Sequence, residues 1–380
     1  MVSTESEYVK AAFLAQDPML EVKKSYAEKM EKDAIRDLVL ERRGILILDL
    51  DHTLFQVTMR PITTEFRGIE TWNFQTELTH SGTLLEGKTY WFTLDSSPRG
   101  TAPFFLHLRP GLFSFLETAS KMFELYAYTQ GTTEYAKKIL TGIDPKGKWF
   151  GNSRLIAREL DPHTGRTIPK TLARVFPSEE DLVLIIDDRD DVWDKKAGQF
   201  NLIKLLPFLY FPDPEREKMM NGWPSGARLS SSDQQLKYLE HLLNDVHSEA
   251  FFGNTQTTIS QTLYSRKRLL FSNMYFASNE QVSKNIFRLI TDFGGKILHN
   301  EHKFGVVNIH IGVPGQGGQG EGPEWIHPWF ILFSISTLTV PSDPSLFSIH
   351  RIANENIQTM WECVHETAGE ESDLLADLLA

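Results

Sequence analysis

The stretch ILILDLDHTL, residues 45–54, decides the fold. It begins with four apolar residues, Ile45–Leu48, continues with carboxylates at the alternating positions Asp49 and Asp51, and ends with the hydroxyl of Thr53 and a leucine. A short apolar run bounded by polar residues is typical of a central parallel strand that helices bury on both faces. Open α/β sheets bind ligands beyond the carboxyl ends of such strands, so both aspartates are predicted to lie at a functional edge.

Two further apolar runs follow the first, at Leu125–Thr129 and Leu182–Ile186, and helical patterns at Leu112–Met122 and Thr133–Leu140 lie among them. Buried strands that alternate with helices are typical of a doubly wound parallel sheet. We therefore predict an α/β fold with a doubly wound parallel sheet.

The remaining patterns divide the chain into regions. The stretch Phe66–Leu94 alternates Thr, Trp, Phe and Gly and is too long for a plain connection, so we expect a β-rich insertion near the site. In chain order, the expected regions are a helical segment at 1–43, a catalytic domain at 44–212 with its insertion at about 56–105, a helical linker at 213–265, a second small α/β domain at 266–350 and an acidic tail at 351–380.

The composition excludes several classes of protein. The chain has 380 residues with 39 Lys and Arg against 50 Asp and Glu, hence a formal net charge of −11. The single cysteine, Cys363, excludes an intramolecular disulfide, and no apolar run approaches the roughly 20 residues that span a bilayer. The acidity argues against non-specific binding to nucleic acid. We expect a soluble intracellular protein.

Acidic side chains follow a second predicted strand. Leu182–Ile186 is followed directly by Asp187 and Asp188, while the strand at Leu125–Thr129 ends in a hydroxyl and Lys170 lies in the stretch between these strands. Clustered carboxylates raise each other's pKa unless a cation joins them, and oxygen ligands favour a hard ion, with Mg²⁺ the default for phosphate chemistry. The alternative is that each acidic pair caps a helix or solvates a loop.

The sequence Asp49-Leu-Asp51-x-Thr53 resembles the aspartate-nucleophile motif of the haloacid-dehalogenase superfamily, which implies a haloacid-dehalogenase-like parallel sheet core. The surrounding sequence resembles one branch of it, the phosphatases of the RNA polymerase II C-terminal domain that associate with a general transcription initiation factor. The supporting runs are Leu106-His-Leu-Arg109-Pro-Gly111, Tyr128-Thr129-Gln-Gly131-Thr-x-x-Tyr135-Ala136, Ile143-Asp144-Pro145, Phe150-Gly151-Asn152 and Ile186-Asp187-Asp188-Arg189-x-Asp191-Val192-Trp193.

The resemblance implies a role for each member of the acidic cluster. Asp49 would attack phosphorus and become an aspartyl phosphate. Asp51 would protonate the leaving serine oxygen and later activate water. Asp188 would complete a magnesium site together with Asp49 and the main-chain carbonyl of Asp51.

The resemblance also implies which groups hold the substrate. Thr129 and Lys170 would bind the phosphoryl oxygens, with Asp187 orienting Lys170. Four other residues match family positions near the cleft and are expected to contact a phosphoserine-proline peptide, with core packing or surface pairing as the alternative. These four are Arg109, Tyr135, Arg189 and Trp193.

The second domain resembles a BRCT domain. The matching residues are Phe287-x-Leu289-Ile290-x-x-Phe293-Gly294-Gly295-x-Ile297, with Trp329 further on, and a strand is expected in LLFSNMYF, residues 269–276. In phosphopeptide-binding members a hydroxyl residue is followed by glycine, whereas here Ser272 is followed by Asn273. We therefore expect a scaffold role rather than phosphate recognition.

Two motifs lie near the C-terminus. Gly315-x-Gly317-x-x-Gly320 matches a dinucleotide fingerprint but leads into Glu321 and Pro323 rather than a helix, so it is interpreted as a loop. The acidic, leucine-bearing stretch at 366–380 resembles the tail with which this branch docks on the initiation factor. The alternative is a solvated chain end.

These observations together predict a nuclear, magnesium-dependent protein serine phosphatase that acts on the heptad repeats of RNA polymerase II. Two alternatives stay open: a phosphatase of another phosphoprotein or a small metabolite, and a non-enzymatic adaptor that uses its acidic cleft and BRCT-like domain only for docking.

Overall fold

The computed structural model describes most of the chain, and it divides into two compact units. The described residues are 8–10, 21–59, 71–73, 84–94, 103–151, 154–161, 164–176, 180–211, 233–254, 257–278, 282–298, 308–312 and 324–349. The first unit comprises Met1–Phe208 and Leu236–Tyr264, and the second comprises Leu209–Gln235 and Ser265–Ala380. Among the described helices, none combines the length and the apolar character that crossing a membrane requires.

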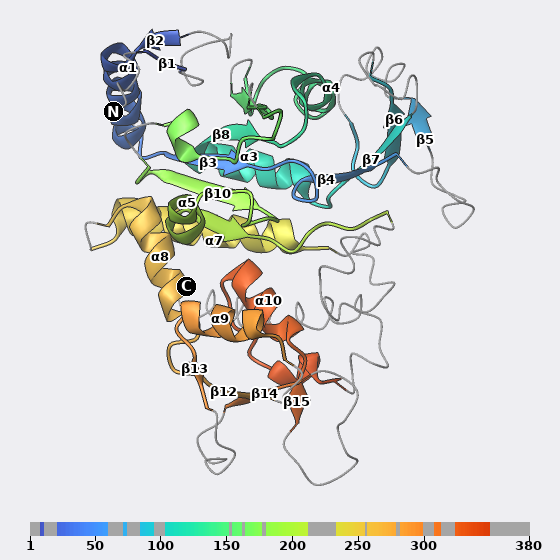
Figure 1. The fold of residues 1–380 in the computed structure, drawn as a ribbon, viewed down its shortest axis with the longest axis vertical. Coiled ribbons are helices and arrows are strands. Elements are labelled where there is room, and N and C mark those ends of the chain that lie inside the picture. The colour runs from blue at the N-terminus through green and yellow to red at the C-terminus, as the bar shows by residue number, and fades with distance from the viewer. Residues whose placement is uncertain are drawn as a thin grey trace, which may run out of the picture. The chain divides into compact units, whose positions relative to one another are not determined.

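A five-stranded parallel sheet forms the centre of the first unit, in the order β11-β10-β3-β8-β9. Figure 1 labels its inner strands β10, β3 and β8. Its strands are β3 (Gly44–Leu48), β8 (Phe123–Tyr128), β9 (Leu155–Ile156), β10 (Val183–Asp187) and β11 (Leu202–Lys204). Every residue of β3 and β10 is buried, as expected for apolar runs in the middle of a parallel sheet. The predicted α/β architecture is confirmed.

The helices of this sheet begin at sequence signals for helix starts. They are α3 (Leu112–Met122), α4 (Thr133–Ile143), the short η2 (Leu172–Arg174) and α5 (Lys195–Phe200). The side chain of Thr132 caps α4 by accepting a hydrogen bond from the backbone N–H of Tyr135 at 3.3 Å, and that of Asp194 caps α5 through Ala197 at 3.0 Å. Helix α3 follows Gly111, which has a φ of +77° and so favours glycine.

The described part of the insertion forms a second sheet, in the order β4-β7-β6-β5. Its strands are β4 (Phe55–Thr58), β5 (Thr71–Asn73), β6 (Thr89–Phe92) and β7 (Phe104–Leu108). The carboxylate of Glu86, between β5 and β6, accepts from the backbone N–H groups of Gly111 and Phe113 at 2.9 and 3.0 Å. Because β4 continues directly from the loop that holds Asp51, the insertion sheet is joined to the predicted site by the chain itself.

The linker expected at 213–265 differs from the structure, in which Leu236–Tyr264 belong to the first unit. Helix α7 (Gln235–Phe252) and the first residues of α8 (Ile259–Leu269) belong to the first unit, along with α1 (Lys24–Leu40), β1 (Tyr8–Lys10) and β2 (Glu21–Lys23). Leucines of α7 are buried, the ring of His247 lies 2.7 Å from the carbonyl of Arg42, and Ser260 donates its N–H to the carbonyl of Asp181 at 3.0 Å. These helices are therefore part of the core and do not form a solvated connection.

The second unit contains a four-stranded parallel sheet in the order β13-β12-β14-β15. Its elements are β12 (Tyr275–Ser278), α9 (Lys284–Asp292), β13 (Lys296–Ile297), β14 (Ile309–Ile311), β15 (Trp325–Ile326), α10 (Trp329–Thr337) and η4 (Pro344–Phe347). The strand expected from Leu269 begins only at Tyr275, because α8 continues through Leu269 and a turn follows it. The resemblance to BRCT domains stays a prediction.

Close backbone contacts explain the pair of glycines after α9. Gly294 has a φ of +90°, and a Cβ added there would lie 2.1 Å from the carbonyl oxygen of Arg268. A Cβ on Gly295 would lie 2.6 Å from Cγ2 of Ile290. The Gly315–Gly320 motif and the acidic tail at 351–380 lie outside the described residues.

We expect Gly294→Ala to destabilise the second unit by about 2–4 kcal/mol, because both the left-handed backbone and the contact with a rigid carbonyl penalise a side chain. Thermal and urea unfolding of the full chain would measure the effect. Gly198→Ala is the control, since a Cβ there meets no atom within 4 Å. Equal stability of the two variants would contradict the prediction.

Candidate active site

The loop between β3 and β4 presents two of the predicted carboxylates. The backbone N–H of Asp49 donates to the carbonyl of Ile186 at 2.9 Å, which fixes Asp49 at the carboxyl end of the sheet. The chain then turns, and His52 has a φ of +62°, a conformation that costs energy for a residue other than glycine. The N–H of Phe208 donates to the carbonyl of His52 at 2.7 Å, which helps to support this turn.

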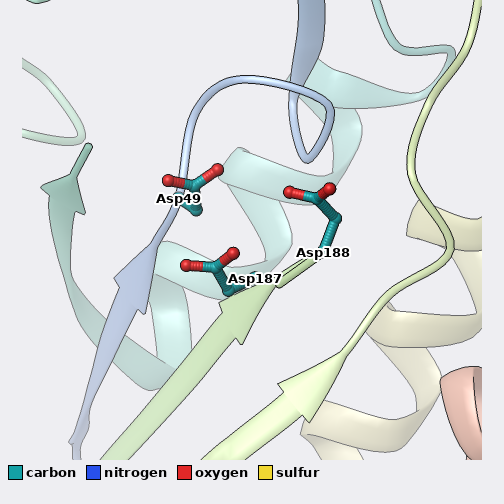
Figure 2. Close-up of side chains that lie close together, drawn as sticks. All are labelled: Asp49, Asp187 and Asp188. Carbon is teal, nitrogen blue, oxygen red and sulfur yellow. The ribbon is translucent and has the colours of Figure 1, made fainter. Parts of the chain in front are cut away.

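Three aspartates from two neighbouring strands meet beyond this edge (Figure 2). Asp49 follows β3, while Asp187 ends β10 and Asp188 follows it, and one carboxylate oxygen from each lies within 4.8 Å of the others. All three side chains are buried. The N–H of Asp188 also donates to Oγ1 of Thr53 at 3.1 Å, which joins the two loops.

Lys170 supplies a cation to two members of this cluster. Its Nζ donates to Oδ1 of Asp49 at 2.5 Å and to Oδ2 of Asp187 at 2.7 Å, and the side chain is 1% exposed. Burial alone would lower the pKa of Lys170, but the charges of Asp49 and Asp187 outweigh burial and raise that pKa. The ammonium therefore stays protonated at neutral pH.

The hydrogen bonds of Asp187 indicate that it orients Lys170. Its Oδ1 accepts from the backbone N–H of Arg189 at 2.8 Å, and its Oδ2 accepts from Lys170 and from Nε1 of Trp193, the latter at 2.8 Å. Donors therefore engage both carboxylate oxygens of Asp187.

The electrostatics of Asp49 fit a site for a divalent cation. Burial is the main reason that the pKa of Asp49 is raised well above its usual value, and the charge of Asp187 adds to this, against the lowering effect of Lys170. Bringing several carboxylates together is unfavourable without more positive charge than one ammonium carries. Carboxylate oxygens are the ligands that Mg²⁺ prefers, so the donor set fits this ion.

Thr129 lies at the same edge of the sheet. It follows β8, which pairs in parallel with β3 so that Ala127 is opposite Leu48. Its side chain is buried, and Oγ1 accepts the N–H of Gly131 at 2.9 Å. The structure therefore places a hydroxyl and a tight turn beside the strand that leads to Asp49.

The second aspartate of the motif is held by Tyr135, whose hydroxyl donates to Oδ1 of Asp51. Burial, followed by the charge of Asp51, raises the pKa of Tyr135 well above its usual value, so the hydroxyl is neutral at working pH. The sequence pattern predicts that Tyr135 contacts a peptide. It gives no sign of the contact with Asp51, because the two residues are far apart in the chain.

Arg109 and Trp193 are both buried. Arg109 is 0% exposed, and its guanidinium donates to the carbonyls of Thr53 and Leu206 at 3.0 and 3.1 Å. This burial favours the alternative of core packing for Arg109, and its contact with a peptide stays a prediction. Trp193 is buried against Tyr128, and its indole N–H donates to Asp187, so it too supports the site from within.

Arg189 is the exposed member of the predicted peptide-contacting set. Its Nε and Nη2 donate to the two carboxylate oxygens of Asp191 at 2.9 and 2.6 Å. The pKa of Arg189 is raised, with this hydrogen bond as the largest cause. A contact between Arg189 and a substrate stays a prediction.

The sequence of this chain matches a family model and several curated proteins. A family model described as NLI interacting factor-like phosphatase matches residues 44–248. An RNA polymerase II C-terminal domain phosphatase of Schizosaccharomyces pombe is 36% identical over 186 residues, which cover 49% of this chain and 24% of that protein. Its counterpart of the same name in Encephalitozoon cuniculi is 34% identical over 185 residues, covering 49% of this chain and 37% of that protein.

A solved structure shares the fold. That of Fcp1, described as an essential RNA polymerase II CTD phosphatase, has a TM-score of 0.59 at 22% identity and covers 84% of this chain and 99% of that one. This likeness supports the fold alone. The chain spans well under half the length of the two curated relatives, 24% and 37%.

Proposed function

The chain belongs to the family of NLI interacting factor-like phosphatases, and from this premise we propose that it is a magnesium-dependent protein serine phosphatase that acts on the phosphorylated heptad repeats of RNA polymerase II. One observation carries the proposal: the buried ammonium of Lys170 bridges Asp49 and Asp187 beside Asp188. The names of the curated relatives support the choice of substrate.

In the proposed reaction, a carboxylate oxygen of Asp49 attacks phosphorus and the serine oxygen leaves, which forms an aspartyl phosphate on Asp49. Asp51 gives its proton to the leaving oxygen as the bond to phosphorus breaks. It then takes a proton from the water that hydrolyses the aspartyl phosphate. General acid–base catalysis of this kind typically raises the rate about 10²–10⁴-fold.

Positive charge and fixed donors hold the transferred group. Lys170 would bind a phosphoryl oxygen while Asp187 keeps it in place, and Thr129 would bind another. Asp49, Asp188 and the main-chain carbonyl of Asp51 would hold Mg²⁺, which would offset charge on the phosphoryl group. Phosphoryl transfer depends mainly on such positioning and charge neutralisation.

The proposal also covers the location of the protein in the cell and a binding partner. A phosphatase of the polymerase tail would act in the nucleus, and a general transcription initiation factor is the proposed partner of the acidic tail. The tail supplies carboxylates together with Leu374, Leu375, Leu378 and Leu379 at helical spacing. Such a segment suits a basic groove with apolar pockets.

The substrate proposal predicts at least about 100-fold higher kcat/KM on phosphorylated heptad peptides than on a panel of sugar and nucleotide monophosphates. The expected preference arises because remote parts of a peptide contribute binding energy to the reaction. Phosphate release in the presence of Mg²⁺ would measure both sets. Preference for a metabolite would overturn the substrate, and activity on neither set would favour the adaptor.

A further inference from the structure

We propose that Tyr135 is a positioning residue, which holds Asp51 in the orientation needed to protonate the leaving serine oxygen, and that the insertion sheet holds Tyr135 in turn. The inference rests on the proposed function and adds a residue to its acid–base step. It also gives the β-rich insertion a part in catalysis.

The first observation is the contact with the acid itself. The hydroxyl of Tyr135 donates to Oδ1 of Asp51, and the tyrosine side chain is buried. With Oδ1 held in this way, the carboxyl group of Asp51 can carry its proton on Oδ2. Rotation of the carboxyl group would break the bond to Tyr135, so the bond restricts that rotation.

The ring of Tyr135 is fixed by the insertion sheet. Its centroid lies 6.1 Å from that of Phe92 on β6 and 6.2 Å from that of Phe104 on β7. The two phenylalanine rings stack on each other at 5.3 Å, so the three rings form one cluster. A shift of β6 or β7 would therefore move the hydroxyl that holds Asp51.

The main chain fixes Tyr135 from the other side. Its N–H donates to Oγ1 of Thr132 in the first turn of α4, and the absence of a side chain at Gly131 makes room for the ring. A Cβ on Gly131 would lie 2.6 Å from Cδ1 of Tyr135. The hydrogen bond to Thr132, the close approach of Gly131 and the aromatic cluster together restrict the movement of the tyrosine ring.

In the step that forms the aspartyl phosphate, this arrangement affects only leaving groups that need a proton. A serine alkoxide leaves poorly unless Asp51 protonates it as the oxygen–phosphorus bond breaks, whereas p-nitrophenolate leaves readily as an anion. Loss of the Tyr135 hydroxyl should therefore lower kcat/KM, which reports this first step, for serine phosphates and spare it for aryl phosphates. The later step, in which Asp51 activates water, is common to both kinds of substrate and affects kcat alone. A purely structural defect would slow both substrates alike.

The test compares the wild-type chain with Tyr135→Phe in the presence of Mg²⁺, on a phosphoserine heptad peptide and on p-nitrophenyl phosphate. We expect kcat/KM to fall about 10–100-fold on the peptide, up to the lower end of the range of acid–base catalysis, with less than about a 3-fold change on the aryl phosphate. KM for the peptide should change little. Tyr126→Phe is the matched control, since it removes a buried hydroxyl that donates to Oε1 of Glu124 at 2.7 Å, away from the site.

The outcomes are distinct. Equal losses of kcat/KM on both substrates, no loss, or a rise in KM alone would overturn the inference, the last because it marks Tyr135 as a substrate contact. If the wild-type chain releases phosphate from neither substrate, the proposed function fails instead. Phe104→Leu is a second variant for the case in which Tyr135→Phe misfolds, and it should lower kcat/KM for the peptide relative to that for the aryl phosphate in the same way.

Discussion

Replacing Asp49 with asparagine is expected to reduce phosphate release at least about 10⁴-fold, on peptide and aryl phosphates alike, because an amide cannot form the acyl phosphate intermediate. Asparagine keeps the size of the side chain and can still accept a hydrogen bond from Lys170. The loss should therefore appear in kcat while the chain stays folded. Phosphate release at saturating substrate and Mg²⁺ measures it.

Asp190→Asn is the matched control for this substitution. Asp190 lies in the loop that follows Asp188, but its carboxylate is exposed and pairs with Nζ of Lys204 at 2.6 Å. Removing its charge should leave the rate within about a factor of three, since exposed ion pairs contribute little. Retained activity in Asp49→Asn would mean that the nucleophile lies elsewhere.

The three inner strands of the central sheet, β10, β3 and β8, could be predicted from the sequence because they are short apolar runs with polar ends, whereas the edge strands β9 and β11 were not predicted. The predicted bounds of α3, Leu112–Met122, match the structure, since Gly111 and the following strand define both ends. The prediction of a linker was wrong because periodicity shows that α7 has an apolar face but not which unit buries that face. Tertiary packing decides this, and it assigns α7 to the first unit.

The acidic cluster could be predicted because topology alone brings the carboxyl ends of parallel strands together. Asp49, Asp187 and Asp188 lie side by side in the structure for this reason. Arg109 could not be placed in this way. Its burial depends on the antiparallel register of β4 and β7, in which Phe55 is opposite Leu108, and on a carbonyl of Leu206 that no motif indicates.

Replacing Lys170 with methionine is expected to abolish phosphate release and to destabilise the first unit by about 3–5 kcal/mol at neutral pH. Asp49 and Asp187 would lose the ammonium that both contact, and burying carboxylates without a cation to offset their charge is costly. Urea unfolding in the absence of Mg²⁺ would measure the effect. Lys204→Met, which breaks an exposed pair, should cost less than about 1 kcal/mol.

A double-mutant cycle separates charge from packing at this site. If uncompensated charge causes the instability, adding Asp187→Asn to Lys170→Met removes one buried carboxylate and should recover about half of the lost stability, whereas activity stays lost. If Lys170 contributes mainly by packing, the second substitution recovers nothing, because it restores none of the contacts that the lysine made. Mg²⁺ should likewise raise the stability of Lys170→Met more than that of the wild type, since in the proposed site the ion and the ammonium offset the same carboxylates. The stability of the fold and the binding of the phosphoryl group would then both depend on how far positive charge offsets the buried carboxylates. This shared dependence would account for a buried lysine beside these aspartates.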